Sequence, residues 1–320
     1  MTAPPPFPLL AAPVARPGDP RLAGWRANVG AAVTLSVPGS PAAPSVSSLL
    51  VLSWNVWVGR GRVTELVLRL REGAFAALGA DPALPLVVLL QEALRADATV
   101  PERSNGWAPR EIVARLRPRE DVVETARRLG LHLRYAPSMR NGPDRTDRGN
   151  AILSTLPLAD ASAVELPFEY QRRAAVLASV ELGGGRLRLA SGHLDPRGPL
   201  GHKWLGAAGR AIQMRHLLAA LEEDTVILGA DLNLGRGRAE PAWRALQEAG
   251  FTFGVPPVLP TWRHTYHALP RLVLDYIMVR DRRGTVGGAR IHRLDEDAAD
   301  RGPTVFGSDH HPLLARIDFQ

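Results

Sequence analysis

Apolar residues occur along this chain in two arrangements, short unbroken runs and longer stretches with helical spacing. Unbroken runs rich in leucine and β-branched residues predict strands that are buried on both faces. Such runs occupy residues 48–58, 84–93 and 225–231. Apolar residues at intervals of three and four predict helices, and these stretches are residues 64–80, 110–116, 121–130, 203–223 and 240–250.

Strands dominate the remainder of the chain and follow one another closely. Three glycines at 183–185 separate two apolar runs, which predicts a hairpin turn. The other expected strands lie at residues 131–137, 149–155, 159–168, 172–182, 186–194, 271–279, 287–294 and 313–319. Hairpins combined with strand–helix–strand units predict an α/β (α+β) fold in which helices cover mixed sheets.

Two segments depart from this pattern. Residues 1–47 are rich in proline, alanine, glycine and serine, which predicts a largely irregular N-terminal extension with a short strand at 31–37. One folded domain is expected at residues 48–320. Within it, residues from about 95 to 148 form an arginine-rich insertion, interpreted as a solvated helix face, with a substrate-facing arm as the alternative.

Composition narrows the classes of function that the chain can have. The 320 residues, 45% of them hydrophobic, can bury a sizeable core, and the absence of cysteine excludes disulfides and thiolate metal sites. The formal net charge of +7 favours an anionic partner such as nucleic acid or a lipid head group. Lys203 is the only lysine, so the positive charge comes from arginine, which suits phosphate contacts but also fits a coding bias.

Membrane insertion and export are not expected. No apolar run is long enough to span a bilayer, so a transmembrane segment is not predicted. Residues 1–15 contain no lysine or arginine, and prolines interrupt their apolar part, which argues against a signal peptide. We therefore favour a cytoplasmic protein, with secretion left open, and a monomer.

Polar residues follow four of the expected buried strands where each leaves the core. These residues are Asn55, Glu92, His193 and Asp231. Because strand ends in α/β folds share one rim, where ligands bind, we expect the four side chains to lie together. We expect the Gly/Ser/Pro-bounded turn at 307–312, just before the last strand, to join them.

The residue types at this rim limit the available chemistry. Three carboxylates and one amide would form an oxygen-rich site suited to Mg²⁺ or Mn²⁺, contributed by Glu92, Asp231, Asp309 and Asn55. Two histidines beside such a cation suit phosphoester hydrolysis, one as a proton shuttle and the other as a charged group that stabilises oxyanions. The sequence lacks a serine nucleophile elbow and a phosphate-binding glycine-rich loop, so attack by an activated water is the simplest mechanism.

Two further acidic positions have competing interpretations. Asp275 interrupts the apolar run 271–279, and a buried carboxylate needs a partner, either a catalytic imidazole or an arginine in a structural salt bridge. Asp231 and Asn233 are two residues apart, so both would point to one side of an extended segment. The alternative for this pair is an Asx turn or a helix cap.

Seven motifs together resemble one protein family. WNV, QE, GNAILS, SGHLD, GADLN, LDYIMV and SDHHPL occur in this order between residues 49 and 317. The ordered set resembles the endonuclease/exonuclease/phosphatase superfamily, whose fold is that of DNase I. The resemblance implies a four-layer sandwich of two packed mixed β-sheets flanked by helices, with a catalytic site at one edge. Residues 48–320 would form that catalytic domain.

The resemblance also implies roles for individual residues. The metal-binding positions of the family match Asn55, Glu92 and Asp309. The catalytic positions match His193 as the phosphate-stabilising or acid histidine, Asp231 and Asn233 as the pair that orients water and holds phosphate, and Asp275 as the partner of the general base His310. The positions that contact or shape the phosphate site match Arg172 or Arg173, and Asn150.

Departures from the family pattern bear on the substrate. Ala230 replaces the usual glycine before Asp231, which is tolerated unless that position needs a positive φ. Trp57 argues against the abasic-site endonuclease branch. Charge favours a phosphodiesterase or nuclease acting on nucleic acid. The alternative is a phosphatase or phospholipase C-like hydrolase of a small-molecule or lipid phosphoester, with an aromatic pocket formed by Trp204, Trp262 and Tyr266. A non-catalytic binding scaffold is a third hypothesis.

Overall fold

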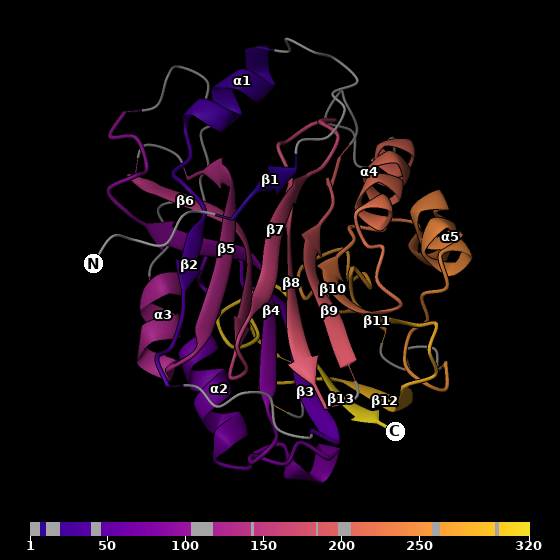
Figure 1. The fold of residues 1–320 in the computed structure, drawn as a ribbon. Helices are drawn as coiled ribbons and strands as arrows, with labels where there is room; N and C mark the ends of the chain where they lie inside the picture. The colour runs from indigo at the N-terminus through magenta and orange to yellow at the C-terminus, as the bar shows by residue number, and fades with distance from the viewer. Residues whose placement is uncertain are drawn as a thin grey trace.

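The computed structural model describes residues 7–10, 20–39, 46–103, 118–141, 144–183, 185–197, 206–257, 263–297 and 301–320. Their strands form two mixed β-sheets that pack face to face, with helices on both outer surfaces (Figure 1). The expected four-layer α/β sandwich is confirmed.

The first sheet has six strands in the order β1-β7-β8-β9-β10-β11. Their bounds are β1 Leu9–Leu10, β7 Ala159–Glu165, β8 Ala174–Leu182, β9 Gly185–His193, β10 Thr225–Asp231 and β11 Asp275–Asp281. β9 and β10 run parallel, and β8 and β11 pair antiparallel to them on either side. The predicted hairpin at the glycine triplet is confirmed, because Leu182 at the end of β8 pairs with Gly185 at the start of β9.

The second sheet has seven strands in the order β12-β13-β3-β4-β6-β5-β2. Their bounds are β2 Val33–Leu35, β3 Ser48–Asn55, β4 Leu86–Ala96, β5 His132–Arg140, β6 Thr146–Ser154, β12 Val286–Arg293 and β13 Leu313–Phe319. β3 and β4 are parallel at the centre, and β13 and β6 flank them in the antiparallel direction.

Helices cover the outer face of each sheet. Their bounds are α1 Pro20–Ala27, α2 Val63–Arg71, α3 Val122–Leu129, α4 Ala207–Ala219 and α5 Pro241–Glu248. α2 and α3 pack on the seven-stranded sheet, and α4 and α5 pack on the six-stranded sheet. α3 follows its sequence signals closely, because Asp121 accepts hydrogen bonds from two backbone N–H groups at its start and Gly130 ends it at φ 64°.

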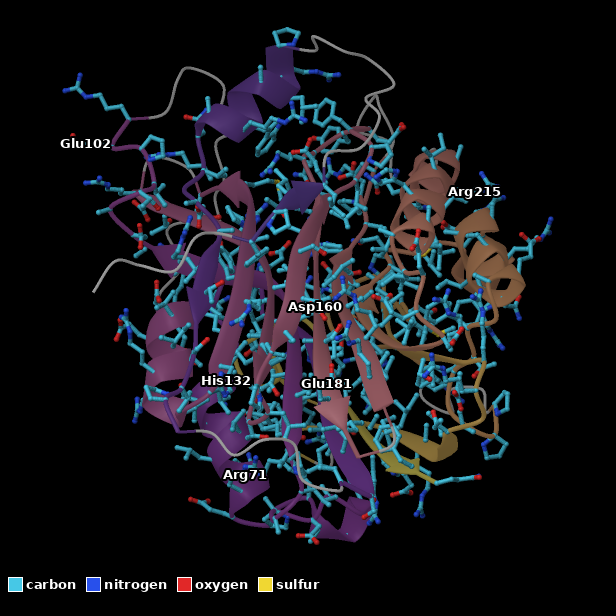
Figure 2. The ribbon with its side chains drawn as sticks, in the orientation of Figure 1. Arg71, Glu102, His132, Asp160, Glu181 and Arg215 are labelled. Carbon is cyan, nitrogen blue, oxygen red and sulfur yellow. The ribbon has the colours of Figure 1, made fainter. Side chains whose placement is uncertain are left out.

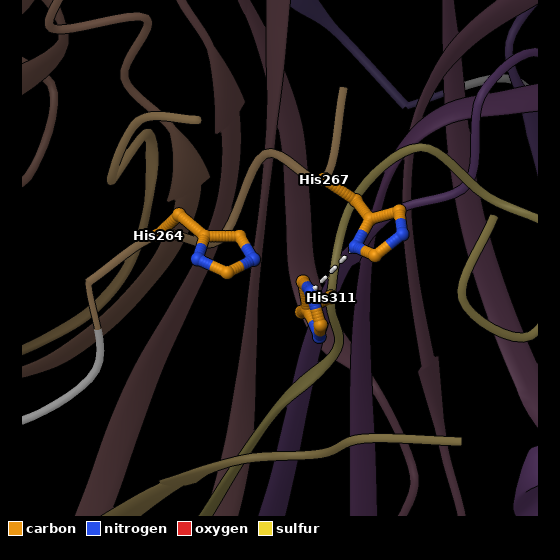
Figure 3. Close-up of side chains that lie close together, drawn as sticks. All are labelled: His264, His267 and His311. Atoms are coloured by element: carbon orange, nitrogen blue, oxygen red, sulfur yellow. Dashed lines mark hydrogen bonds between the residues drawn. The ribbon is translucent and has the colours of Figure 1, made fainter. Parts of the chain in front are cut away.

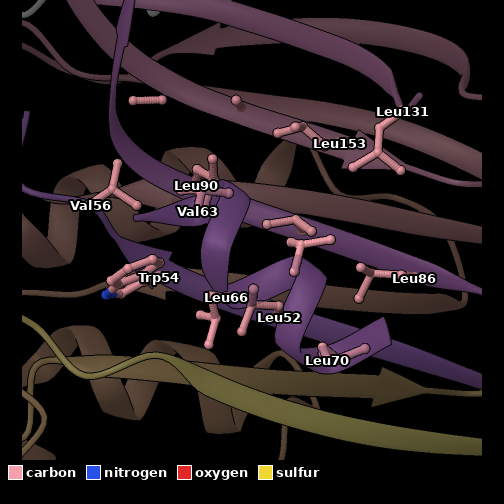
Figure 4. Packing of buried hydrophobic residues seen from close by; sticks show 14 of the residues in the cluster. Leu52, Trp54, Val56, Val63, Leu66, Leu70, Leu86, Leu90, Leu131 and Leu153 are labelled. Atoms are coloured by element: carbon pink, nitrogen blue, oxygen red, sulfur yellow. The ribbon is translucent and has the colours of Figure 1, made fainter. Parts of the chain in front are cut away.

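The central strands are apolar on both faces because each sheet packs against the other sheet on one face and against helices on the other. On β3, Leu49 and Val51 enter the core between the sheets, whereas Leu50, Leu52 and Trp54 enter the core under the helices. Figure 4 shows Leu52 and Trp54 in this second core. All five side chains are fully buried. The side chains of a strand alternate between its faces, so a strand between two cores must read as a continuous apolar run.

Two predicted elements differ from the structure at their ends. The single helix expected at 64–80 ends at Arg71, and Gly73 at φ 83° turns the chain before a short 3₁₀ turn at Ala76–Leu78. A residue with positive φ cannot continue a helix, which explains the break. The strand expected at 271–279 begins only at Asp275, so this carboxylate lies at the strand's end.

The N-terminal segment contains more structure than its composition predicts. β2, which pairs with β5, is the short strand expected at 31–37, whereas β1 and α1 were not expected. Arg95 and Asp147 form a buried ion pair that also holds this segment, because Asp147 accepts from Gly30 N at 2.9 Å and Arg95 donates to the carbonyl of Ala31. The side chains of the pair are 1% and 0% exposed.

This buried pair gives a stability prediction. Asp147→Ala removes the acceptor of Arg95, of the Tyr135 hydroxyl at 2.7 Å and of Gly30 N, leaving a buried guanidinium without its countercharge. We expect the free energy of unfolding, measured by urea denaturation, to fall by about 3–5 kcal/mol. The exposed pair of Asp224 and Arg283 supplies the control, since Asp224→Ala should cost less than about 1 kcal/mol. Equal losses in both variants would contradict this account.

Some of the many arginines are buried and form hydrogen bonds within the fold. Arg140 and Arg280, both fully buried, donate to the backbone carbonyls of Glu102 and Glu223, which lie in loops. Other charged side chains, such as Glu102 and Arg215, lie at the periphery of the molecule (Figure 2). The helix expected at 110–116 lies outside the described residues. Among those that are described, no helix is long and apolar enough to cross a bilayer.

Candidate active site

Three strand ends place polar side chains side by side at one edge of the six-stranded sheet. β9 ends at His193, β10 ends at Asp231 and β11 begins at Asp275. Asp231 pairs with His193 in the parallel ladder and with Asp275 in the antiparallel ladder. The register therefore sets one histidine and two carboxylates in a row.

The seven-stranded sheet contributes to the same edge. β3 ends at Asn55, whose amide nitrogen donates to Asp231 Oδ2 at 2.9 Å across the gap between the sheets. The amide oxygen of Asn55 accepts from the backbone N–H of Trp57 at 3.0 Å. The rim expected from the strand ends therefore forms at the junction of both sheets.

Glu92 reaches this edge through an irregularity in β4. The pairing of β4 with β6 shifts register between Leu90 and Ala93, and Glu92 adopts φ 54°, a conformation uncommon for residues other than glycine. Gly59 N donates to the Glu92 carbonyl at 3.1 Å, which fixes the bulge. Such bulges re-aim a side chain and are frequent beside active sites.

Asp231 is the centre of the hydrogen-bonding network. Its Oδ2 lies 2.9 Å from Asn55 Nδ2, 3.3 Å from His193 Nε2 and 3.9 Å from His310 Nε2. Its Oδ1 accepts from Asn233 N at 3.0 Å. One carboxylate thus connects both sheets and both histidines.

His310 is paired with Asp275. His310 Nδ1 lies 2.8 Å from Asp275 Oδ2, and both residues are buried, at 5% and 1% exposure. A carboxylate on Nδ1 fixes the imidazole tautomer, so that Nε2 faces Asp231. This contact distinguishes the two interpretations of Asp275, because its ion-pair partner among the described residues is an imidazole and not an arginine.

Three contacts hold the turn that carries Asp309 and His310. Ser308 Oγ donates to the carbonyl of Asn55 at 2.7 Å and accepts from His310 N at 3.1 Å. Trp54 Nε1 donates to the carbonyl of His310 at 2.8 Å. These bonds fasten the turn to the end of β3, so the position of His310 does not depend on a loose loop.

Burial and charge perturb the titration of this network. Burial raises the pKa of Asp231 to about 7 and that of Asp309 to about 6, and in Asp309 the charge of Glu92 acts in the same direction. Burial lowers the pKa of His193 well below its usual range, and the charge of Arg173 adds to this effect. For His310 burial also acts downward, but the charges of Asp275 and neighbouring carboxylates outweigh it and raise the pKa to about 10.

The carboxylates fit a hard divalent cation. Asp309 Oδ1 is buried and makes no hydrogen bond within the described residues, although Asp309 and Glu92 repel each other. Asp231, Asp275 and His310 offer three more ligand atoms, all within 4.8 Å of one another. Clustered carboxylate oxygens without a full set of donors are the environment that Mg²⁺ and Mn²⁺ prefer.

The comparisons with known proteins agree with this geometry. The model of the endonuclease/exonuclease/phosphatase family matches residues 52–310, most of the chain. The chain belongs to this family. No curated protein sequence matches it. The resemblance that the seven motifs suggest is confirmed.

Solved structures from the family have the same fold at low sequence identity. An endonuclease/exonuclease/phosphatase from Beutenbergia cavernae DSM 12333 has a TM-score of 0.56 and 16% identity, over 85% of this chain and 72% of that one. The human Nocturnin catalytic domain with bound sulfate anion has a TM-score of 0.54 and 16% identity, over 90% and 97%. D. rerio TDP2 complexed with single strand DNA product has a TM-score of 0.50 and 17% identity, over 85% and 99%.

Three residues with expected phosphate roles make mainly internal contacts in this endonuclease/exonuclease/phosphatase fold. Arg172 is buried between Glu165 and the carbonyls of residues 137 and 138. Asn150 donates to the carbonyl of residue 174 at 2.7 Å. Arg173 contacts Asp195 at 3.1 Å and His193 Nδ1 at 3.0 Å. Arg173 therefore reaches the site through His193, as a positioning residue.

The local backbone around Asn233 differs from the expected extended segment. Asn233 has φ 50°, and its N–H donates to the Asp231 side chain, which is the Asx turn given as the alternative. Its side-chain nitrogen donates to the carbonyl of Leu194 at 3.0 Å. Ala230 is an ordinary strand residue of β10, so it is tolerated in place of the family's glycine.

Some site residues were missed by the sequence analysis or given another role. Tyr266 packs on His310 with ring centroids 5.0 Å apart, whereas Trp204 and Trp262, the other members of the expected aromatic pocket, lie outside the described residues. Asp195, the last residue of the SGHLD motif, is 1% exposed and holds Arg173. Its place in that motif, two residues after His193, was the signal available for it.

Proposed function

We propose that this chain is a divalent-metal-dependent phosphoester hydrolase that cleaves nucleic acid phosphodiesters by direct attack of an activated water. The observation that supports it most is the convergence at one edge of a carboxylate-oriented histidine, His310, a second histidine, His193, and acidic side chains suited to a cation. Water-activating and phosphate-stabilising groups must be held within a few ångströms of each other for such a reaction.

Each residue has a role that follows from its contacts. In its neutral form His310 donates its Nδ1–H to Asp275 and accepts a proton from water at Nε2. The neighbouring carboxylates favour the charged form of His310, and a cation held by acidic residues of the site would offset their charge and lower the pKa of His310. Asp231 Oδ2, between the two histidines, orients that water. Arg173 donates to His193 Nδ1, so His193 carries its proton on Nε2 and can donate it to a phosphate oxygen.

The cation would be held by Glu92, Asp309 and the remaining lone pair of the Asn55 amide oxygen. It would neutralise charge that develops on the phosphate oxygens in the transition state. Asn55 has a second task in the structure, because its amide nitrogen holds Asp231 in place. Arg148 also belongs to this region, because its charge helps to lower the pKa of His193. An arginine at this position suits contact with an anionic substrate.

Charge and structural similarity favour nucleic acid among phosphoesters. The net charge of +7 attracts a polyanion, although buried arginines with structural partners account for part of the arginine content. A protein with the same fold, D. rerio TDP2, was solved with a single strand DNA product. Another, the human Nocturnin catalytic domain, binds a sulfate anion, which has the charge and tetrahedral shape of phosphate.

A substrate panel tests this proposal. Plasmid DNA, single-stranded DNA, RNA, bis-p-nitrophenyl phosphate and phospholipid vesicles would be incubated with the protein and Mg²⁺ or Mn²⁺, beside the His310→Ala variant. We expect cleavage of at least one nucleic acid, and cleavage by the variant that is slower by about 100-fold or more. Hydrolysis of phospholipid alone would overturn the substrate preference in favour of the lipid alternative. No hydrolysis of any of them would overturn the enzymatic proposal and leave a binding scaffold.

A further inference from the structure

Three histidines outside the catalytic network form a second buried cluster. His264 and His267 lie in the loop before β11, and His311 follows the catalytic His310 (Figure 3). The three are 6%, 5% and 0% exposed, and each offers a ring nitrogen within 4.8 Å of the other two.

The protons of two of these rings are assigned by their neighbours. His267 Nε2 lies 2.8 Å from the carbonyl oxygen of Gly302, which can only accept, so this nitrogen carries a proton. His311 Nδ1 lies 2.9 Å from Asp295 Oδ1 and 3.2 Å from the carbonyl oxygen of Leu294, so it also carries one. In their neutral forms the two rings therefore have lone pairs on His267 Nδ1 and His311 Nε2.

Those two lone pairs point at each other. His267 Nδ1 and His311 Nε2 are 3.2 Å apart, and His264 completes the group with its ring centroid 5.2 Å from that of His311. Facing lone pairs repel unless a proton or a cation lies between them. Imidazole nitrogens whose opposite N–H groups donate to a carboxylate and to a backbone carbonyl have the outer contacts usual for metal-ligating histidines.

We propose that His264, His267 and His311 bind a zinc-class divalent cation, distinct from the carboxylate-held cation of the catalytic site. Imidazole nitrogens suit Zn²⁺, whereas Mg²⁺ prefers oxygen. His311 and His267 are oriented by Asp295 and by the Gly302 carbonyl. The buried setting favours a structural ion over a catalytic one.

The surrounding charges permit a cation here. Arg293 is a positive group in contact with the cluster, but its Nη2 pairs with Asp295 at 2.8 Å and its Nη1 donates to the carbonyl of His264 at 3.0 Å. Its distance to His264 Nε2 is 3.4 Å, longer than a usual N–H hydrogen bond. The Asp295 carboxylate offsets the guanidinium, so the cluster is not dominated by positive charge.

The ion would stabilise the turn that carries Asp309 and His310 through the neighbouring loop at 263–267. His267 N donates to the carbonyl of Asp309 at 2.7 Å, and His311 N donates to the carbonyl of Thr265 at 2.8 Å. Tyr266, between these residues, packs on His310. A cation that connects the loop at 263–267 to His311 would therefore fix the segment that carries His310.

Direct metal binding tests this proposal without any activity measurement. Untagged protein, stripped with a chelator and kept in excess Mg²⁺, would be titrated with Zn²⁺ and with Co²⁺, whose visible absorption reports nitrogen coordination. We expect one equivalent to bind and the melting temperature to rise by about 5 °C or more at saturating Zn²⁺. Asp295→Asn should weaken binding by about 10–100-fold, because it replaces the carboxylate that orients His311 with a neutral amide.

Matched variants separate this site from the catalytic one. His267→Gln should abolish the equivalent, whereas Glu92→Gln, which alters the catalytic cation site, and His292→Gln, on β12 outside the cluster, should retain it. No binding of Zn²⁺ or Co²⁺ by the unaltered chain would overturn the proposal, and a shared proton would then account for the 3.2 Å contact. Loss of the equivalent in Glu92→Gln would also overturn it by placing the ion at the carboxylates.

Discussion

His310→Ala is expected to lower kcat/KM for phosphodiester hydrolysis by about 10²–10⁴-fold, the usual contribution of a positioned general base. The substitution removes the imidazole that Asp275 holds at Nδ1 and whose Nε2 lies 3.9 Å from Asp231 Oδ2. Substrate binding should change less than turnover, because His193 and the acidic residues stay in place. Steady-state kinetics on bis-p-nitrophenyl phosphate measures both parameters.

Two controls make this result specific. His292→Ala removes a half-buried histidine of β12 and should leave kcat within about twofold, as expected of a residue outside the site. Asp275→Asn keeps the shape of the side chain but replaces one acceptor with a donor, so it should lower kcat with KM little changed. If His310→Ala retained full activity, the assignment of His310 as the base would be wrong.

Glu92→Gln is expected to have opposite effects on activity and stability. Glu92 and Asp309 repel each other in the absence of a cation, since the charge of Glu92 raises the pKa of Asp309 further. Removing one charge weakens cation binding, so we expect activity at fixed low Mg²⁺ to fall by about 100-fold and to recover partly at high Mg²⁺. Stability of the metal-free protein should be kept or should increase, because a repulsive pair is lost.

The measurement for this variant is a Mg²⁺ titration of activity beside thermal unfolding in EDTA. Glu72→Gln, which neutralises an acidic residue at the end of α2, is the matched control and should change neither. A Glu92→Gln protein with an unchanged Mg²⁺ requirement would contradict the role of Glu92 as a ligand. A large loss of stability in EDTA would instead assign Glu92 a structural role.

The sequence predicted most of the sandwich because its central strands are buried on both faces. The apolar runs that contain β3, β4 and β10 are continuous because these strands contact a hydrophobic core on each face. The N-terminal segment was predicted only in part, because the short strand β2 was expected and α1 was not. α1 depends on distant partners such as Glu165, which pairs with Arg26, and local composition does not reveal such contacts. Helix α2 was predicted too long because Gly73 was not interpreted as a stop.

Site residues at strand ends were predictable, and those that act through other residues were not. Asn55, His193 and Asp231 stand where strands leave the core, so position alone indicates them. The tie of Arg173 to His193 requires the three-dimensional neighbourhood, since an arginine before a strand has many possible partners. The histidine cluster was missed for the same reason, because 264, 267 and 311 converge only after folding.

The most direct test of the central claim is the divalent-cation dependence of phosphodiester hydrolysis by the unaltered chain. Bis-p-nitrophenyl phosphate would be assayed in EDTA, after addition of Mg²⁺ or Mn²⁺, and again after renewed chelation. The account predicts no hydrolysis in EDTA, activity on addition of either cation and its loss on chelation. Hydrolysis that persists in EDTA, or none with either cation, would contradict it.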